Sequence, residues 1–383
     1  MPEKLNPLIE TILSFEAKWC NSLNIYNPYN DPWPIKISKN MPDFDGQAFR
    51  KYRNHNFIYD KLYIAQSQGI QSGTLNQLIL QKPNNLEFPI FIKPRYGHKS
   101  ASSKNCFKIK NFEELKKYQD IPEMMWSEFI NDKEGMTDYF LYEGRIVHQI
   151  TYEYSETQHG VVADDWKKIS PLTTPPREIT NWVNETMKNY TGACNVQYRG
   201  TKIIEVGLRL ARGGAYIYST DNPLLIKSIN QLVDEGMWDW SITKENLAFT
   251  PYYSFKCYTE VPIIYLFPQH LIDLYMKQNN CKDFYEYYFE PGGKGVSMVC
   301  FQFLHEDFEK GMKIKKNIEF LIAFIQLFFI IAYILAILIA LFYHQSMGIL
   351  ILIILTIFFT TRLINPLSMN INLFNAQKQA LFG

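Results

Sequence analysis

The amino-acid sequence predicts an α+β globular region followed by a helical hairpin in a membrane. Before residue 317, apolar runs of strand length, such as FPIFIKP and KIIEVGL, alternate with helix-like stretches such as NFEELKKY. This mixture of strands and helices is typical of an α+β protein. After residue 317 the chain has two long apolar runs, separated by the short polar break HQSMG. The 383 residues suffice for two or three globular parts with a sizeable core.

The two apolar runs predict the hairpin. The first, residues 320 to 343, is about as long as a helix that crosses a bilayer and is apolar on every face. The second, residues 349 to 364, is shorter, so a hairpin that dips into the bilayer without crossing it is an alternative, as is a buried helical pair. Lysines precede the first run, and Arg362 lies near the end of the second. This charge at both outer ends predicts a membrane-anchored protein whose main domain faces the cytosol.

Composition narrows the classes of partner. Lys and Arg total 39 against 38 Asp and Glu, a formal net charge of +1, so no nucleic-acid partner is expected. The six cysteines are scattered and form no CxxC pair. They therefore argue against a zinc site or a disulfide framework and favour reduced thiols. The first residues include acidic side chains and a proline, whereas a cleaved secretory signal peptide needs a basic N-terminus and an unbroken apolar run. No cleaved signal peptide is therefore expected.

A first candidate site follows the strand-like run FPIFIKP. This run ends at Lys93 and Pro94, and a polar stretch with Gly97 and several serines comes next. A lysine fixed at the end of a strand can hold a phosphate, and a loop of small residues can offer N–H groups to an anion. The glycine patterns of the P-loop and of the Rossmann fold are both absent. A solvated basic loop is the alternative interpretation.

A second candidate site surrounds the sequence YRGTK, which predicts the turn of a β-hairpin. Gln197 and Glu205 flank this turn, and Arg209 follows. Side chains two and four residues apart in a strand point to the same face, so Glu205 and Arg209 are expected to point the same way. A carboxylate and an arginine on one face suit a metal-bound polyphosphate, and a surface ion pair is the alternative.

The order and spacing of these motifs resemble the ATP-grasp superfamily, in the branch of carbamoyl-phosphate synthetase and biotin carboxylase. The resemblance runs from YDKLYIAQSQGI to ARGGAYIYS. It implies an ATP-grasp fold, in which two α+β subdomains clasp a nucleotide. It also implies a ligase that joins a carboxylate to an amine through an acyl phosphate, with ATP and Mg²⁺ as cofactors. The implied parts are a reduced N-terminal region (1–60), two grasp subdomains (61–127 and 128–250), a small β-rich subdomain (251–316), the membrane hairpin (317–365) and a tail (366–383).

The resemblance also implies a role for individual residues. Those matching nucleotide and phosphate contacts are Lys61, Lys93, Tyr96, Gly97, His98, Lys99, Ser100, Ser102 and Ser103. Those matching the adenine hinge and the ribose-binding acid are Glu128, Phe129, Ile130 and Glu134. The metal ligands match Gln197 and Glu205. Arg209, together with Arg212 beside the paired glycines, matches the position that faces the transferred phosphoryl group.

The chain departs from the family pattern in two places. Gly207 stands where the family has an asparagine, and glycine has no side-chain oxygen for magnesium. Only about 60 residues precede Lys61, too few for the usual front domain. Two hypotheses follow. The first is a membrane-anchored ligase whose partners are ATP, an unidentified carboxylate and amine, and the lipid bilayer. The second is a degenerate ATP-grasp module that serves as a membrane-tethered scaffold or a nucleotide-binding interaction protein.

Overall fold

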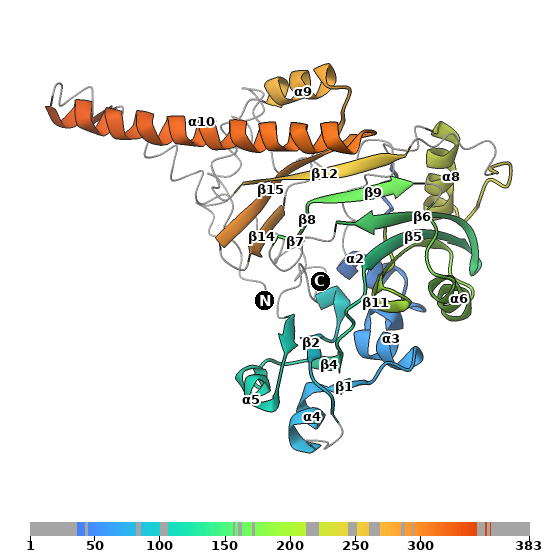
Figure 1. The fold of residues 1–383 in the computed structure, drawn as a ribbon. Coiled ribbons are helices and arrows are strands. Elements are labelled where there is room, and N and C mark those ends of the chain that lie inside the picture. Colours follow the sequence, from blue (N-terminus) through green and yellow to red (C-terminus); the bar gives the residue numbers. More distant parts are fainter. Residues whose placement is uncertain are drawn as a thin grey trace. The chain divides into compact units, whose positions relative to one another are not determined.

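The chain divides into two compact units in the computed structural model (Figure 1). The larger unit comprises Trp33–Tyr252 with Ala380–Gly383, and the smaller comprises Met1–Pro32 with Tyr253–Gln379. The structure describes residues 37–42, 45–81, 86–99, 106–155, 158–159, 163–170, 173–211, 222–243, 251–259, 269–284, 288–292, 295–342, 349–350 and 353.

The larger unit contains a small antiparallel sheet. Its strands, in spatial order, are β1 (Ser72–Thr74), β4 (Met124–Glu128), β2 (Ile90–Pro94) and β3 (Phe107–Ile109). The helices α4 (Leu75–Gln81) and α5 (Phe112–Leu115) contribute to its core. Ile90 and Ile92 in β2 are fully buried in that core. Because side chains alternate along a strand, Lys93 points to the opposite face from these isoleucines.

A second sheet in the larger unit carries the other candidate residues. Its strands follow one another in the order β11 (Lys202–Gly207), β10 (Gly192–Arg199), β5 (Glu134–Tyr142), β6 (Arg145–Tyr154) and β9 (Trp166–Ser170), each antiparallel to the next. β10 and β11 form the hairpin predicted at YRGTK, with Gly200 in the turn at φ +54°. The short strands β7 (Gln158–His159) and β8 (Ala163–Asp164) form a separate pair.

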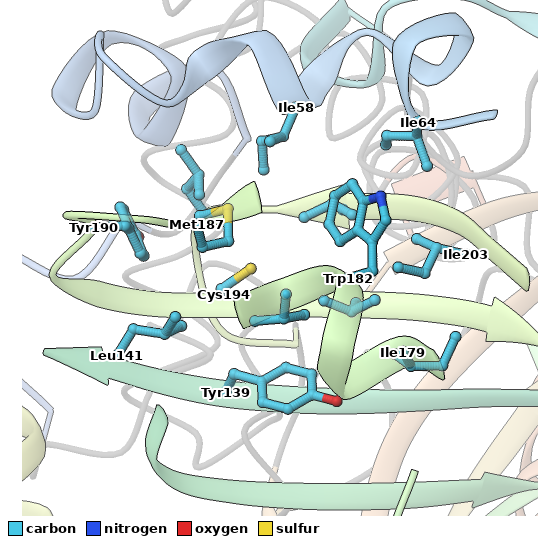
Figure 2. Close-up of a cluster of buried hydrophobic side chains, with 14 of the residues drawn as sticks. Ile58, Ile64, Tyr139, Leu141, Ile179, Trp182, Met187, Tyr190, Cys194 and Ile203 are labelled. Carbon is cyan, nitrogen blue, oxygen red and sulfur yellow. The ribbon is translucent and has the colours of Figure 1, made fainter. Parts of the chain in front are cut away.

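Helical segments pack on this sheet around one apolar core (Figure 2). The segments are α2 (Asp45–Lys51), the 3-10 turn η1 (Asn56–Tyr59), α3 (Lys61–Ser67) and α6 (Arg177–Thr186). The larger unit also contains two further 3-10 turns, η2 (Gly97–Lys99) and η3 (Lys116–Tyr118), and the helix α8 (Pro223–Asp234). Ile58 and Ile64 from the first segments meet Trp182 of α6 and Ile203 of β11 in this core. Trp182 Nε1 also donates a hydrogen bond to Ser67 Oγ at 2.8 Å. The core therefore fixes the N-terminal helices against β11.

The smaller unit is built around one long strand. β15 (Gly295–His305) pairs with β12 (Tyr252–Thr259), β13 (Lys282–Phe284) and β14 (Tyr288–Gly292), and the helices are α9 (Gln269–Gln278) and α10 (Phe308–Phe342). Phe255 of β12 and Phe303 of β15 are fully buried, and their rings stack at 5.2 Å between centroids. Gly311 in α10 lies against Phe255, so any side chain there would displace that ring.

The first apolar run lies in α10, a helix that begins well before it. The first turns of α10 are charged, yet Ile314, Lys315 and Ile318 in them are buried. In the described ranges, no helix is both long and apolar enough to cross a membrane. The predicted location, a membrane with the main domain facing the cytosol, is therefore wrong, because a helix that crosses a membrane must be both long and apolar. The hairpin and the lipid-bilayer partner lack support, and most of the second run lies outside the described residues.

Candidate functional site

Lys61 and Glu205 form an ion pair between α3 and β11. Lys61 is the first residue of α3, whose cap is Asp60; the Asp60 carboxylate accepts a hydrogen bond from Leu62 N at 3.0 Å. Arg95 holds the same carboxylate through Nε at 2.8 Å. The Lys61 side chain is 7% exposed, and its Nζ lies 3.0 Å from Glu205 Oε1. A capped helix start thus fixes one cation against one carboxylate.

The charges of this pair stabilise each other. Burial opposes ionisation of both groups. Glu205 outweighs that effect at Lys61 and raises the pKa of its ammonium group. Lys61 likewise outweighs burial at Glu205 and lowers the pKa of that carboxyl group. Both groups are therefore charged at neutral pH.

Lys93 reaches the same segment of β11 from the small sheet. Its Nζ donates a hydrogen bond to the carbonyl oxygen of Ile204 at 2.8 Å. Burial, with a smaller effect from the nearby charge of Lys61, lowers the pKa of Lys93 to about 8. Two lysines that are far apart in sequence thus converge around Glu205, one on its side chain and one on the backbone just before it. One buried and one half-buried cation placed in this way can hold a polyphosphate.

Gln197 lies directly opposite Glu205 in the β10–β11 hairpin, immediately before a register shift. Directly opposed residues in an antiparallel pair have neighbouring side chains. Gln197 Nε2 lies 4.0 Å from Met136 Sδ. The amide oxygen and the carboxylate offer the hard oxygen ligands that Mg²⁺ prefers, and Mg²⁺ usually takes only one or two carboxylates besides water and phosphate. Three or more His, Cys, Asp or Glu side chains do not gather into a metal site anywhere in the described ranges.

Arg209 is held by a carboxylate from the N-terminal helix α2. Arg209 Nη2 donates to Asp45 Oδ2 at 2.6 Å, and Nη1 donates to the carbonyl oxygen of Leu210 at 2.8 Å. Burial opposes the charge on Arg209, but Asp45 outweighs it and raises the pKa of the guanidinium. The buried Nε of Arg209 has no hydrogen-bond acceptor among the residues described. This nitrogen can still donate to an incoming anion.

Tyr59 completes the contact around Asp45. Its hydroxyl donates to Asp45 Oδ1 at 3.2 Å and accepts from Leu208 N at 2.9 Å. Burial and the charge of Asp45 raise the pKa of Tyr59 far above its ordinary value. Tyr59 therefore stays protonated, and it ties α2 to the chain just after β11.

The predicted phosphate loop lies beside this site only in part. A side chain on Gly97 would meet Lys61 Cε at 3.4 Å and Glu205 Oε1 at 3.5 Å. His98 is buried and stacks on Phe49 at 3.7 Å between ring centroids. Lys99 instead pairs with Glu123 Oε1 at 2.7 Å and lies 5.0 Å from the centre of the Tyr96 ring. Ser100, Ser102, Ser103 and Arg212 lie outside the described residues.

The residues predicted to hold adenine and ribose lie at the end of β4, in the segment just after it and at the start of β5. Glu128 is exposed at the end of β4. Lys108 Nζ lies 3.9 Å from the centre of the Phe129 ring, and Ile130 packs on a small apolar cluster that contains Met125. Glu134 Oε2 accepts a hydrogen bond from Arg199 Nη2 at 2.9 Å. The structure thus brings together Lys61, Lys93, Gly97, Gln197 and Glu205, and it leaves the nucleoside contacts as predictions.

Comparison with solved structures identifies the fold of the chain. Carboxyaminoimidazole ribonucleotide synthase from Aspergillus clavatus, solved with ATP, matches 73% of this chain and 79% of its own at a TM-score of 0.52 and 8% identity. The N5-carboxyaminoimidazole synthase of the same organism, solved with ADP and 5-aminoimidazole ribonucleotide, matches 71% and 75% at a TM-score of 0.51 and 8% identity. This chain has the ATP-grasp fold. The predicted α+β ATP-grasp architecture is confirmed, without its membrane hairpin.

The ATP-grasp similarity is one of fold. L-amino acid ligase from Bacillus licheniformis also matches, over 71% of both chains at 14% identity and a TM-score of 0.46. No model of a protein family matches the chain, and no curated protein matches its sequence significantly. At such identities the fold is shared, whereas the activity must be argued from the site.

Two carboxylates in the larger unit, called the ATP-grasp unit from here on, were not recognised as site residues by the sequence analysis. Asp138 is fully buried in β5 and accepts hydrogen bonds from Asn195 Nδ2 at 2.7 Å, Ala211 N at 3.0 Å and Tyr152 Oη at 2.9 Å. Burial raises its pKa to about 6. A lone acid within the apolar run MTDYFLY was the available signal. Asp45 gave no signal, because no local pattern links it to β11.

Proposed function

We propose that this chain is an ATP-dependent ligase that joins a carboxylate to an amine through an acyl phosphate, using ATP and Mg²⁺. The observation that carries the proposal is the convergence of Lys61 and Lys93 on Glu205, with Gln197 directly opposite. This places one buried and one half-buried cation beside two oxygen-bearing side chains. The ATP-grasp neighbours from Aspergillus clavatus were solved with ATP and ADP, which supports a nucleotide at this place.

The chemistry assigns each side chain a task. Lys61 and Lys93 would hold the triphosphate, and Gln197 and Glu205 would hold magnesium. Magnesium supplies neutralisation of phosphate charge when it is bound. Arg209, with Arg212, would face the transferred phosphoryl group. Tyr96 to Lys99, with Ser100, Ser102 and Ser103, would cover the phosphates, and Glu128 to Ile130 with Glu134 would hold the nucleoside.

The proposed reaction has two steps. A substrate carboxylate oxygen attacks the γ-phosphorus, the bond from that phosphorus to the β–γ bridging oxygen breaks, and ADP leaves. The amine nitrogen then attacks the carbonyl carbon of the acyl phosphate, inorganic phosphate leaves, and the nitrogen loses a proton. Both steps need positioning and charge stabilisation, and neither needs a protein nucleophile.

Calorimetric titration of the full chain with ATP, with and without Mg²⁺, tests the proposal. Lys93→Ala should weaken binding at least about tenfold, or about 1.4 kcal/mol, because it removes a half-buried cation from the phosphates. Glu205→Ala should abolish most of the Mg²⁺ dependence. Lys116→Ala is the matched control, because Lys116 is exposed and pairs with Glu113. A folded wild-type chain that binds no ATP would overturn the proposal.

A degenerate ATP-grasp module that binds nucleotide without turnover is the second candidate. Gly207, which has no side-chain oxygen, favours it. The two candidates differ in ADP release. A ligase should release ADP when ATP is supplied with suitable members of a panel of carboxylates and amines, whereas a scaffold should bind ATP and release none.

A further inference from the structure

Gly207 makes space for a carboxylate from another part of the chain. Glu205 and Gly207 lie two residues apart in β11 and therefore share one face of the strand, and Arg209 follows just after the strand ends. A Cβ atom added to Gly207 would lie 2.8 Å from Asp45 Oδ1, closer than real Cβ atoms approach such a neighbour. Its backbone is not in the left-handed region, so glycine is not required there by conformation. A side chain at position 207 would instead have to displace the Asp45 carboxylate, which occupies that space.

Asp45 is firmly placed at this position. It is the first residue of α2, and Ala48 in the same helix is fully buried in the core shared with β11. Its Oδ2 binds Arg209 at 2.6 Å. Its Oδ1, on the side of Gly207, accepts only the long 3.2 Å bond from Tyr59 among the described contacts. O–H···O bonds are usually about 2.7–2.8 Å, so Oδ1 is the more weakly engaged oxygen.

Two buried nitrogen atoms near Asp45 also lack partners among the described residues. They are Arg209 Nε and His98 Nδ1. His98 is 9% exposed, and the charge of Asp45 acts on its ring. Buried polar atoms without partners are rare in folded proteins and call for a specific explanation. Entry of a polyphosphate beside Asp45 would give Arg209 Nε an acceptor.

We propose that Asp45 is a magnesium ligand, supplying at position 207 the side-chain oxygen that glycine lacks. This inference rests on the proposed function. Asp45, Glu205 and Gln197 then form the oxygen donor set, with two carboxylates, as suits Mg²⁺. Arg209 balances the charge of Asp45, and Lys61 balances that of Glu205. The carboxylate of Asp45, which comes from α2, thereby takes the place of the asparagine side chain that the family has in β11. Gly207 contributes to the site by leaving room for that carboxylate.

Manganese(II) binding in the presence of ADP, followed by electron paramagnetic resonance on the full chain, tests this ligand directly. Asp45→Ala should weaken manganese binding at least tenfold. Gly207→Asn alone should also weaken it, because the new side chain collides with Asp45. The double variant Asp45→Ala/Gly207→Asn should bind manganese more tightly than either single variant, since an oxygen returns to the same place. Asp120→Ala, which removes an exposed carboxylate, should match wild type.

The affinity for ATP without metal shows whether Asp45 binds the metal or only positions Arg209. Loss of a metal ligand leaves metal-free ATP binding unchanged or tighter, because a negative charge near the phosphates is removed. Equal loss of ATP affinity with and without metal would overturn the inference, as would Asp45→Ala binding manganese like wild type. Asp45→Leu, which roughly keeps the size of the side chain but has no oxygen, serves if Asp45→Ala does not fold and should also weaken manganese binding. A wild-type chain that binds neither ADP nor manganese would instead overturn the proposed function.

Discussion

Lowering the pH from 7 to 4.5 should destabilise the ATP-grasp unit through His98. Burial, with a smaller effect from the charge of Lys99, lowers the pKa of His98 from 6.5 to about 4. The unfolded chain therefore binds a proton at higher pH than the folded chain does, so stability falls as the pH drops from about 6.5 toward 4. Integrating this proton linkage between the two pKa values lowers the free energy of unfolding by about 2 kcal/mol between pH 7 and 4.5.

Urea unfolding monitored by tryptophan fluorescence measures this loss. Six of the seven tryptophans lie in the ATP-grasp unit, so the signal reports mainly on it. His98→Phe keeps an aromatic ring against Phe49 and cannot titrate, so it should lose about 2 kcal/mol less than wild type over the same pH range. His55→Phe, which removes a partly exposed histidine, is the control. Equal pH dependence in wild type and His98→Phe would refute the assignment.

Further predictions concern the packing that supports the site. Gly144→Ala should cost at least about 2 kcal/mol in urea unfolding, because Gly144 has φ +82° and an added Cβ would lie 2.8 Å from Asn189 N. Asp138→Asn should cost about 1–3 kcal/mol in the same assay, because its new NH₂ group replaces an acceptor and would face either Asn195 and Ala211 or Tyr152, which donate to the two carboxylate oxygens. Unchanged unfolding midpoints would contradict either prediction.

Local patterns were sufficient to predict part of the site. The β10–β11 hairpin follows from turn residues between apolar runs, and its register places Gln197 opposite Glu205. Lys93 follows two buried isoleucines in a strand, so strand alternation already separates it from the core. In these cases residues that are neighbours in the sequence determine the geometry.

Contacts between distant segments could not be predicted in this way. Asp45 and Arg209 are 164 positions apart, and α2 is only seven residues long, so no repeating pattern marks its inner face. Lys99 belongs to the motif of the phosphate loop, yet it pairs with Glu123 because that carboxylate lies within reach. The membrane prediction interpreted the apolar runs and their flanking charges as a membrane anchor, and nothing in the sequence showed that Ile314, Lys315 and Ile318 at the start of α10 are buried.

The two ion pairs of the site suggest why ATP and magnesium would bind together. Lys61 holds Glu205, and Arg209 holds Asp45. A triphosphate that drew both cations toward itself would leave two partly buried carboxylates unpaired beside its own negative charge, which is unfavourable. Magnesium bound by those carboxylates removes this cost, because each cation and each carboxylate then keeps a partner of opposite charge. On the proposed function, ATP should therefore bind much more weakly without magnesium. Removing either carboxylate should reduce the difference between the two ATP affinities by strengthening ATP binding in the absence of magnesium. A variant that fails to fold would instead lose ATP binding under both conditions.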